Sequence, residues 1–460
     1  MAMSEYRFLN PYNFVRFMGK ARPENDVLGN CPPPPHDRYT GLTGRISCKA
    51  TAVTPLFVSD SHDVKGKEEN AHKTYRFFKV DGHPAIPASS LRGMVRSVFE
   101  AVTNSCLAVF DDRTLSYRPP RGKRQLYKHS IGELLPFPRE QYVSCREYDK
   151  LCPACRVFGW VKDKAESEDD RETLTAYASR VRFSYGEYTE GSAKVLDATT
   201  LAVLSSPKPT TSAFYLLKND KPNATVHYDT SGARLRGRKL YHHHGKQLSG
   251  QEYMRPSNIK DRHNRTIEGA LGAGAVFTFE VDFENLAPKE LGALLYTLEL
   301  EDGLFHRLGY AKPLGFGSIQ VTVESLQVLD WESRLSSVDL TAGWENELTG
   351  AKRAEYKEEF HRAMREHYGT DYENNVLVDL RGLLGEPPEI PIHYPRPGEQ
   401  PDPEGRNYEW FVGNKARIRD RQRKEPKLPA PCALPLAADE SEENSLPLID
   451  RSGRRPARGR

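Results

Sequence analysis

The feature that most constrains the fold of this chain is a run of two alternating apolar segments that flank one amphipathic segment. Apolar and polar residues alternate through Phe277, Phe279, Val281 and Phe283, and again through Ile319, Val321 and Val323, which is the period of a half-buried strand. Between them, Pro288 precedes leucines at helical spacing, Leu291, Leu294, Leu295 and Leu298. The sequence therefore predicts strand, helix and strand over 277–323, with the glycine-rich segment Gly309–Ser318 as the last connection.

A second set of elements lies earlier in the chain. Alternation predicts a strand through Ile46, Cys48, Ala50 and Ala52. A helix is predicted by one apolar stripe, Leu91, Met94, Val95, Val98, Phe99 and Val102, with Ser89 or Ser90 as its cap. A strand at Arg180–Tyr185 completes the order βαββαβ. We therefore predict an α+β fold of the ferredoxin-like or RRM-like type, with a large insertion and a C-terminal extension.

The boundaries of these parts follow from composition. Residues 1–43, which contain the proline run Pro32–Pro35, are expected to be an irregular arm. The patterned domain covers 44–330, and the long gap at about 187–271 predicts an insertion. Residues 331–426 are expected to be a helical and irregular extension. Residues 427–460, rich in Pro, Ser, Glu and Arg, are expected to be a disordered tail.

Charge gives only local information about partners. The chain has 66 Lys and Arg against 63 Asp and Glu, so a nucleic-acid site would need clustered basic residues. Such clusters occur at Arg118–His129 and Arg234–Arg265, while Lys415–Lys427 fits a solvated surface. The second cluster interleaves aromatic rings with charge, as single-stranded RNA binding requires, and its candidate contacts are Arg236, Arg238, Lys239 and His242. No apolar run is long enough for a membrane span, and no signal pattern opens the chain, so we expect a cytoplasmic protein.

Two motifs suit anion binding. Gly309–Ser318 combines three glycines with Lys312, and exposed amides in such a turn favour phosphate. The alternative is a tight helix-to-strand turn. At Ser89–Arg96, two serines and the unpaired amides of a helix start stand near Arg92 and Arg96. The alternative there is a capped helix with two solvated arginines.

The cysteines predict a metal site. Cys145, Cys152 and Cys155 have the spacing of a zinc knuckle, and a tetrahedral site needs one further ligand. Cys106 and His129 are the candidates, and the softness of a thiolate favours Cys106. Four protein ligands would make Zn²⁺ structural rather than catalytic. The alternative is a set of buried free cysteines.

An acidic stretch suggests a second metal. The segment Ser59–Lys73 has no periodicity and is predicted to be a loop, with Asp60, His62, Asp63, Glu68 and Glu69 within it. Carboxylates beside bound RNA can hold Mg²⁺ or another divalent metal and assist backbone cleavage. The alternative is a solvated acidic loop.

Four motifs in order resemble one known group of proteins. The order Thr54–Val58 (TPLFV), Ile86–Arg96 (IPASSLRGMVR), Leu151–Gly159 (LCPACRVFG) and Gly309–Ser318 (GYAKPLGFGS) is similar to that of the RAMP superfamily of CRISPR-associated proteins. The resemblance extends over about 44–330. It is strongest to backbone-type subunits of type III effector complexes, and the insertion resembles that of an insertion-bearing branch such as type III-D.

This resemblance implies partners and site residues. It implies a cytoplasmic ribonucleoprotein with crRNA, target RNA and other effector subunits as partners. It implies crRNA contacts at Ser89, Ser90, Arg92, Arg96, Gly309, Lys312, Gly315, Phe316 and Gly317. It also implies zinc at Cys152 and Cys155, and metal-dependent target-RNA cleavage by an aspartate, here Asp60 or Asp63. The alternatives are a non-catalytic subunit, or an endoribonuclease that processes the CRISPR transcript with His242–His244 as acid or base.

Overall fold

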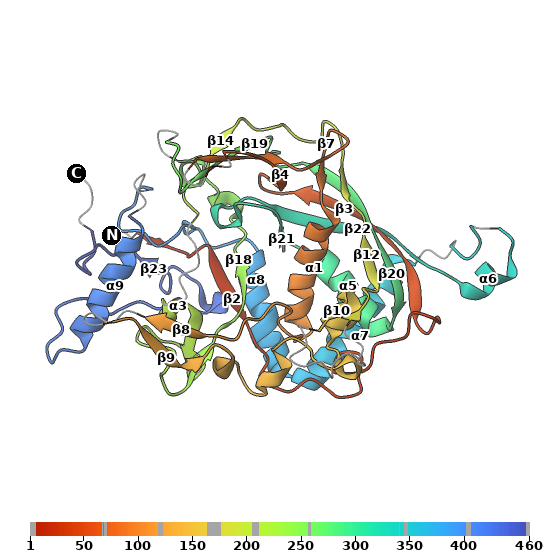
Figure 1. Ribbon diagram of the computed structural model, residues 1–460, viewed down its shortest axis with the longest axis horizontal. Coiled ribbons are helices and arrows are strands. Elements are labelled where there is room, and N and C mark those ends of the chain that lie inside the picture. The colour runs from red at the N-terminus through yellow and green to blue at the C-terminus, as the bar shows by residue number, and fades with distance from the viewer. Residues whose placement is uncertain are drawn as a thin grey trace.

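A computed structural model of the protein shows a mixed α/β fold around a curled sheet (Figure 1). It describes residues 6–66, 68, 71–117, 123–162, 176–204, 211–255, 259–339, 341–344, 348–401 and 406–456. Glu69, Arg118–Gly122 and the last four residues of the predicted tail lie outside the described residues. None of the described helices is long and apolar enough to cross a membrane.

Three long strands form the centre of the main sheet. The strand β3 (Leu42–Ala52) lies between β20 (Val276–Leu286) and β22 (Ser318–Val328) and is antiparallel to both. The predicted alternating strands are thereby confirmed, and each directs its apolar residues into the core. Shorter strands extend the sheet: β12 (Val181–Phe183) and β13 (Gly186–Tyr188) pair with β20, β7 (His83–Ile86) and β6 (Lys79–Val80) follow, and β21 (His306–Arg307) pairs with β22.

The two predicted helices are confirmed and contact each other. The helix α1 (Ala88–Val102) buries its apolar stripe, and α5 (Pro288–Glu299) packs against α1 and against α7 (Gly350–Tyr368). The predicted cap of α1 is wrong, because Pro87 precedes the helix and no side chain caps it. Ser89 and Ser90 instead lie inside the first turn of the helix.

Residues 187–271 do not form a separate body. The strands β14 (Thr199–Thr200) and β19 (Arg265–Glu268) join β5 (Lys73–Phe77) and β4 (Ser59–Lys65) in one sheet. The strand β18 (Gly237–Tyr241) pairs with β2 (Tyr12–Arg16) of the N-terminal arm. The prediction of a loop at 59–73 is wrong for the described residues of β4. Antiparallel pairing with β5, the next strand along the chain, holds this segment as a strand, although its side chains show no apolar period.

The C-terminal region is folded against the N-terminal arm. The prediction of disorder from 427 onward is wrong for the described residues 427–456. There β23 (Leu446–Pro447) pairs with β1 (Arg7–Phe8), and Leu434 and Ile449 are buried against Trp410 and Phe8. The two ends of the chain bury apolar surface that neither could bury alone. The arm at 1–43 is therefore only partly irregular.

The remaining elements are short or peripheral. The helices are α2 (Pro153–Phe158), α3 (Ser212–Tyr215), α4 (Gly250–Tyr253), α6 (Trp331–Ser336), α8 (Val378–Leu384) and α9 (Tyr408–Arg421), with a π-helical turn at Tyr372–Leu377 before α8. The strands are β8 (Thr114–Tyr117), β9 (Gln125–Ser130), β10 (Trp160–Val161), β11 (Ala176–Tyr177), β15 (Leu216–Lys218), β16 (Lys221–Pro222) and β17 (Ala233–Leu235).

Candidate functional site

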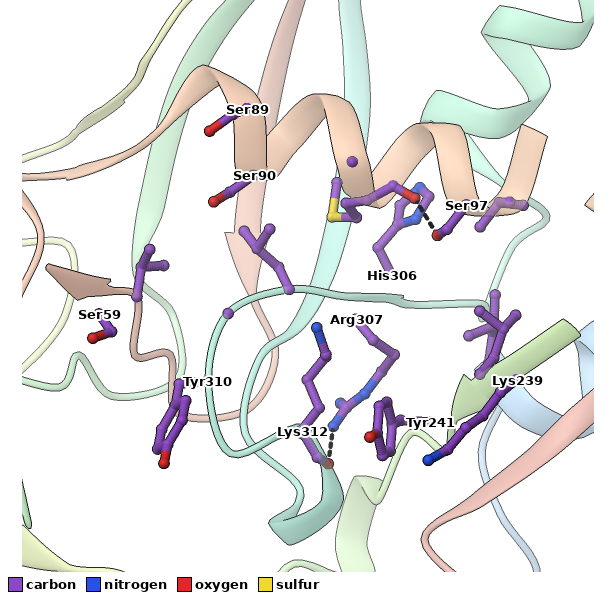
Figure 2. Close-up of a pocket in the computed structure, with 18 residues that line it drawn as sticks. Ser59, Ser89, Ser90, Ser97, Lys239, Tyr241, His306, Arg307, Tyr310 and Lys312 are labelled. Atoms are coloured by element: carbon purple, nitrogen blue, oxygen red, sulfur yellow. Dashed lines mark hydrogen bonds between the residues drawn. The ribbon is translucent and has the colours of Figure 1, made fainter. Parts of the chain in front are cut away.

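A cavity of about 500 Å³ lies between α1, the glycine-rich loop and β18. Figure 2 shows that α1 forms one wall and the loop after β21 the other. The lining includes five residues predicted from sequence to bind RNA: Ser89, Ser90, Lys239, Gly309 and Lys312. Three positive side chains line it and no aspartate or glutamate does. The cavity therefore has the chemistry of an anion site.

The most buried of these charges is Arg307, which the sequence reasoning missed. Its side chain is 8% exposed and donates hydrogen bonds to Ser318 Oγ and to the backbone oxygens of Lys312 (3.0 Å) and Phe316 (2.8 Å). Within the described residues no carboxylate pairs with it, and its Nε has no hydrogen-bond partner. Burial lowers the pKa of Arg307 to about 9. A buried cation without a counter-ion is costly, so a bound anion would stabilise this wall.

Two lysines add to the positive charge of the cavity. Burial lowers the pKa of Lys239 to about 8, and its Nζ lies 3.8 Å from the ring centroid of Tyr12. Burial, together with the nearby Arg307, also lowers the pKa of Lys312. Figure 2 shows Lys312 extending from the loop toward α1. Each lysine holds its proton less tightly here than in water, and a neighbouring phosphate would reverse that effect.

The opposite wall presents small residues of α1. Ser89, Ser90, Gly93 and Ser97 lie along one face of the helix and line the cavity. A Cβ at Gly93 would meet nothing within 4 Å. Glycine within a helix costs about 1 kcal/mol relative to alanine, so packing inside this chain gives no reason for it. Gly93 was not singled out from the sequence, although a glycine inside a strong helical stripe was the available signal.

The glycine-rich loop is both a tight turn and a wall of the cavity. Gly309 and Gly317 have φ of +82° and +77°, and a Cβ there would lie 2.4 Å from Phe57 O and 1.8 Å from Leu308 O. Only glycine fits such a close approach of backbones. Gly315, Phe316 and Gly317 lie behind the wall rather than on it. Phe316 is 1% exposed and packs edge-on against Tyr253, so the prediction that its ring contacts RNA is wrong.

Arg92 and Arg96 do not share the cavity with the serines. Arg92 donates to the backbone oxygen of Phe158, and Arg96 Nε lies 2.8 Å from Glu100. Both side chains face α2, because residues 89, 93 and 97 follow one row of the helix and 92, 96 and 100 follow the next. The expectation that serines and arginines meet one ligand is therefore wrong.

Three of the four candidate RNA contacts in the basic stretch at 234–244 are buried. Arg236 donates to the backbone oxygens of Pro435 (3.0 Å) and Leu434 (2.5 Å), and His242 Nε2 lies 3.1 Å from Glu440. Arg238 lies 3.8 Å from Glu100 and donates to Ser105 O. The prediction that these three side chains contact RNA is wrong. Their partners come from distant parts of the chain, and only Lys239 of the four candidates reaches the cavity.

The three histidines at 242–244 are equally inaccessible. His243 and His244 are 0% and 3% exposed. His243 Nδ1 lies 2.7 Å from Ser318 Oγ, and burial lowers the pKa of this imidazole to about 4. Burial lowers the pKa of His244 as well. Enclosed imidazoles cannot reach an RNA substrate, so the geometry does not favour the transcript-processing alternative.

The cysteine cluster is assembled as the sequence predicts. The Sγ atoms of Cys106, Cys145, Cys152 and Cys155 all lie within 4.8 Å of one another. Cys106 is the fourth member, whereas His129 is exposed and lies beside Glu133. Four thiolates around Zn²⁺ stand about 3.8 Å apart, given Zn–S bonds of about 2.3 Å. The distances of 3.6 Å from Cys106 to Cys152 and to Cys155 fit such a site.

Thiol chemistry agrees with a bound cation. Hydrogen bonding with Cys145 and Cys152, together with burial, raises the pKa of the Cys106 thiol well above its usual value. The four thiols cannot all ionise at this separation without a metal to balance them. The cluster could therefore hold a structural metal such as zinc. Among the described residues it is the single group of three or more His, Cys, Asp or Glu close enough to do so.

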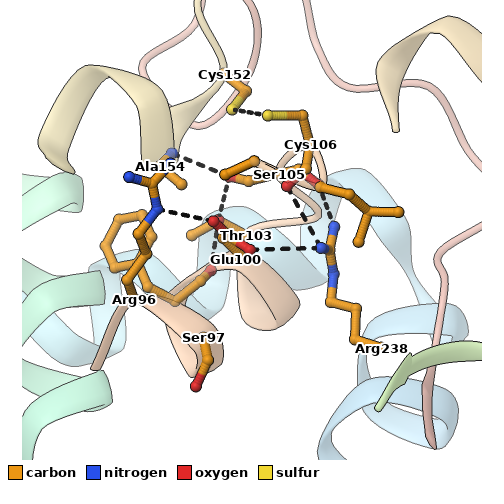
Figure 3. A network of polar contacts seen from close by, with 12 residues as sticks. Arg96, Ser97, Glu100, Thr103, Ser105, Cys106, Cys152, Ala154 and Arg238 are labelled. Atoms are coloured by element: carbon orange, nitrogen blue, oxygen red, sulfur yellow. Dashed lines mark hydrogen bonds and ion pairs between the residues drawn. The ribbon is translucent and has the colours of Figure 1, made fainter. Parts of the chain in front are cut away.

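A polar network connects the cysteine cluster to both walls of the cavity. Figure 3 shows Arg238 of β18 beside Glu100 of α1 and the chain at Ser105 and Cys106. Ser105 Oγ accepts from the amide of Ala154 in the CxxC turn (3.0 Å). The strand that carries Lys239 is therefore fixed to the segment that carries Cys106.

Asp60 and Asp63 lie on β4 rather than in a loop. Asp60 follows Ser59, which lines the cavity, and its Oδ1 accepts from the amide of His62 (2.8 Å). Asp63 lies 3.0 Å from Arg76, which balances its charge. No described acidic cluster surrounds either residue, so protein groups alone do not form a Mg²⁺ site there.

A comparison with models of known protein families identifies the family of this chain. The family model of the RAMP superfamily matches residues 49–320, more than half of the chain. The chain belongs to the RAMP superfamily. The matched region of this RAMP protein contains α1, the cysteine cluster and the whole of the glycine-rich loop. Curated proteins gave no match.

A solved structure was also found. A crystal structure of Csc2 from Thermofilum pendens is 12% identical and covers 78% of this chain and 89% of its own, with a TM-score of 0.30. At that level of similarity it carries no argument about this RAMP protein.

Proposed function

We propose that this RAMP protein is a crRNA-binding backbone subunit of a type III CRISPR RNA-guided effector complex. The observation that carries the proposal is the cavity beside α1, which Arg307, Lys312 and Lys239 line and no carboxylate lines. Three cations and two serine hydroxyls suit a phosphate of the guide backbone. The superfamily membership supplies the context of CRISPR and RNA.

The cavity is suited to the RNA backbone rather than to base identity. Its polar groups are cations, hydroxyls and amides, which bind phosphate and sugar regardless of sequence. Tyr241 and Tyr310 also line it, and aromatic rings accept any base by stacking. A guide-binding subunit needs this tolerance, because the spacer differs from guide to guide.

The arrangement of the main sheet supports a ferredoxin-like core. The elements β3, α1, β12, β20, α5 and β22 follow one another in the chain, and their strands lie in the order β22, β3, β20, β12 with every pair antiparallel. We interpret the segment between β13 and β20 as the insertion, and its length favours an insertion-bearing subunit such as that of type III-D.

The direct test is charge reversal at Lys312. Its ammonium group forms no ion pair with a described carboxylate, and the variant Lys312→Glu places a negative charge against the guide phosphate. Affinity for guide RNA should fall about 10-fold or more, and equally for guides with unrelated spacers. The matched control is Lys246→Glu, the same change at an exposed position outside the cavity.

Fluorescence anisotropy with the purified chain and several guides gives the measurement. A loss that differs between spacers, or one that Lys246→Glu reproduces, contradicts the proposed backbone contact. Melting temperatures of both variants establish that the fold is retained.

Target-RNA cleavage is a separate part of the proposal. Asp60 is the better candidate of the two aspartates, because it adjoins the cavity at Ser59 while Asp63 is paired with Arg76. In the assembled complex with Mg²⁺, Asp60→Ala should abolish cleavage and Asp63→Ala should retain it. If target RNA is uncut by the unchanged complex, or still cut after both changes, the subunit is a non-catalytic one.

A further inference from the structure

The β8–β9 hairpin presents a stack of aromatic rings outside the cavity. Tyr117 of β8 and Tyr127 of β9 stack with centroids 4.6 Å apart and planes at 30°. Tyr127 also lies near the exposed His227, with centroids 6.4 Å apart and planes at 18°. Figure 1 shows β8 and β9 well apart from α1 and beside α3. The hairpin is therefore a surface distinct from the anion cavity.

The stack is held by a small core of its own. Tyr127 packs against Tyr228 at 5.0 Å, and Tyr228 is 2% exposed within a cluster that includes Leu134, Leu216 and Val226. Tyr117 stacks on Tyr127 and is only half-buried. A partly exposed ring that is held by its neighbours loses little conformational entropy when a flat ligand stacks on it.

The hairpin is also strongly basic. No aspartate or glutamate occurs from 113 to 130 in the sequence. The described cations Lys123, Arg124 and Lys128 are exposed, and none forms an ion pair with a described carboxylate. Two acids from outside this segment hold the hairpin in shape: Asp229 accepts from the backbone amides of Lys128 (2.6 Å) and His129 (3.2 Å), and Glu133 accepts from the amide of Ser130 (2.6 Å).

We propose that this hairpin is a second RNA-binding surface, which takes a single-stranded segment by stacking bases on Tyr117 while the three cations neutralise phosphates. Exposed cations next to an open aromatic face are the combination that recognises single strands, because a duplex keeps its base faces covered. The inference does not depend on the cavity, since it uses other elements and other residues.

The test uses the full chain, a short single-stranded oligouridylate and the corresponding duplex. Tyr117→Ala should weaken single-strand binding by about 5-fold or more, the effect of one lost stacking contact, with the duplex unaffected. Tyr117→Phe keeps the ring and should bind within about 2-fold of the unchanged protein.

Charge is tested separately by Lys123→Glu, Arg124→Glu and Lys128→Glu together. This variant should bind about 10-fold more weakly or worse and show a shallower salt dependence. The matched control reverses three exposed cations of the α9 region: Arg419, Arg421 and Lys424. It should change affinity by less than about 2-fold.

Three outcomes overturn the proposal. The first is equal loss in the hairpin and α9 variants, which indicates a general effect of net charge. The second is unchanged affinity in Tyr117→Ala. The third is that the hairpin variants bind RNA with unchanged affinity but fail to assemble with other subunits, which indicates that the hairpin contacts a protein. Lys312→Glu in the same assay separates the two proposals. Loss of affinity in Lys312→Glu but not in the hairpin variants supports the cavity alone, and the reverse supports the hairpin alone.

Discussion

Gly93→Ala should make the protein more stable and bind guide RNA less well. Gly93 lies in the middle of α1 and a Cβ there meets nothing within 4 Å, so the added methyl group creates no clash in the free protein. Alanine is favoured over glycine in a helix interior by about 1 kcal/mol. In a chain of this size that gain raises the melting temperature by about 1–2 °C.

The same methyl group should weaken binding because Gly93 lines the cavity. If the guide backbone packs directly on this face of α1, the methyl group must displace it. Overpacking of a filled site by a methyl group costs about 1–3 kcal/mol. A loss of 1.4 kcal/mol corresponds to about 10-fold in affinity. Thermal melting and anisotropy with guide RNA, on one preparation, measure both effects.

Two further variants sharpen this prediction. Gly93→Leu should weaken binding more than Gly93→Ala, because its side chain fills more of the cavity. Gly350→Ala, at the first residue of α7, changes a helical glycine that does not line the cavity and should leave affinity unchanged. If Gly93→Ala raises the melting temperature but retains the affinity for guide RNA, the RNA does not approach α1 closely. If Gly93→Ala lowers the melting temperature, the space beside Gly93 is not open.

Three other predictions follow from buried charge and the cysteines. Glu290→Ala should destabilise the fold by about 3–5 kcal/mol in urea unfolding, because Arg180 and Arg156, at 2.5 and 3.0 Å from Glu290, would remain buried without a counter-ion. Cys106→Ser should lower the zinc content measured by elemental analysis and the melting temperature. Guide affinity should fall as pH rises through about 8, where Lys239 loses its proton, and Lys239→Arg should remove that fall. Burial lowers the pKa of Lys239 below its value in the unfolded chain, so above pH 8 the unfolded state binds more protons than the folded state. The contribution of Lys239 to the stability of the free protein therefore increases as the pH rises above 8.

Sequence alone determined the parts of this protein that depend on local periodicity and on the chemistry of a few side chains. The strands at 46–52, 277–283 and 319–323 and the helices at 91–102 and 288–298 carry enough alternation or stripe to be recognised without context. The cysteine spacing and the softness of thiolate likewise indicated Cys106 as the fourth member of the cluster.

Only the tertiary structure decided which polar side chains remain available. Arg92 and Arg236 read from sequence as RNA contacts, yet carbonyl groups from distant segments bind both. No sequence motif pointed to Arg307, yet it supplies the most buried charge of the cavity. Local patterns reveal the period of an element and which face is apolar. The partner of a buried arginine, and the row of a helix that faces a ligand, depend on contacts between residues far apart in the chain.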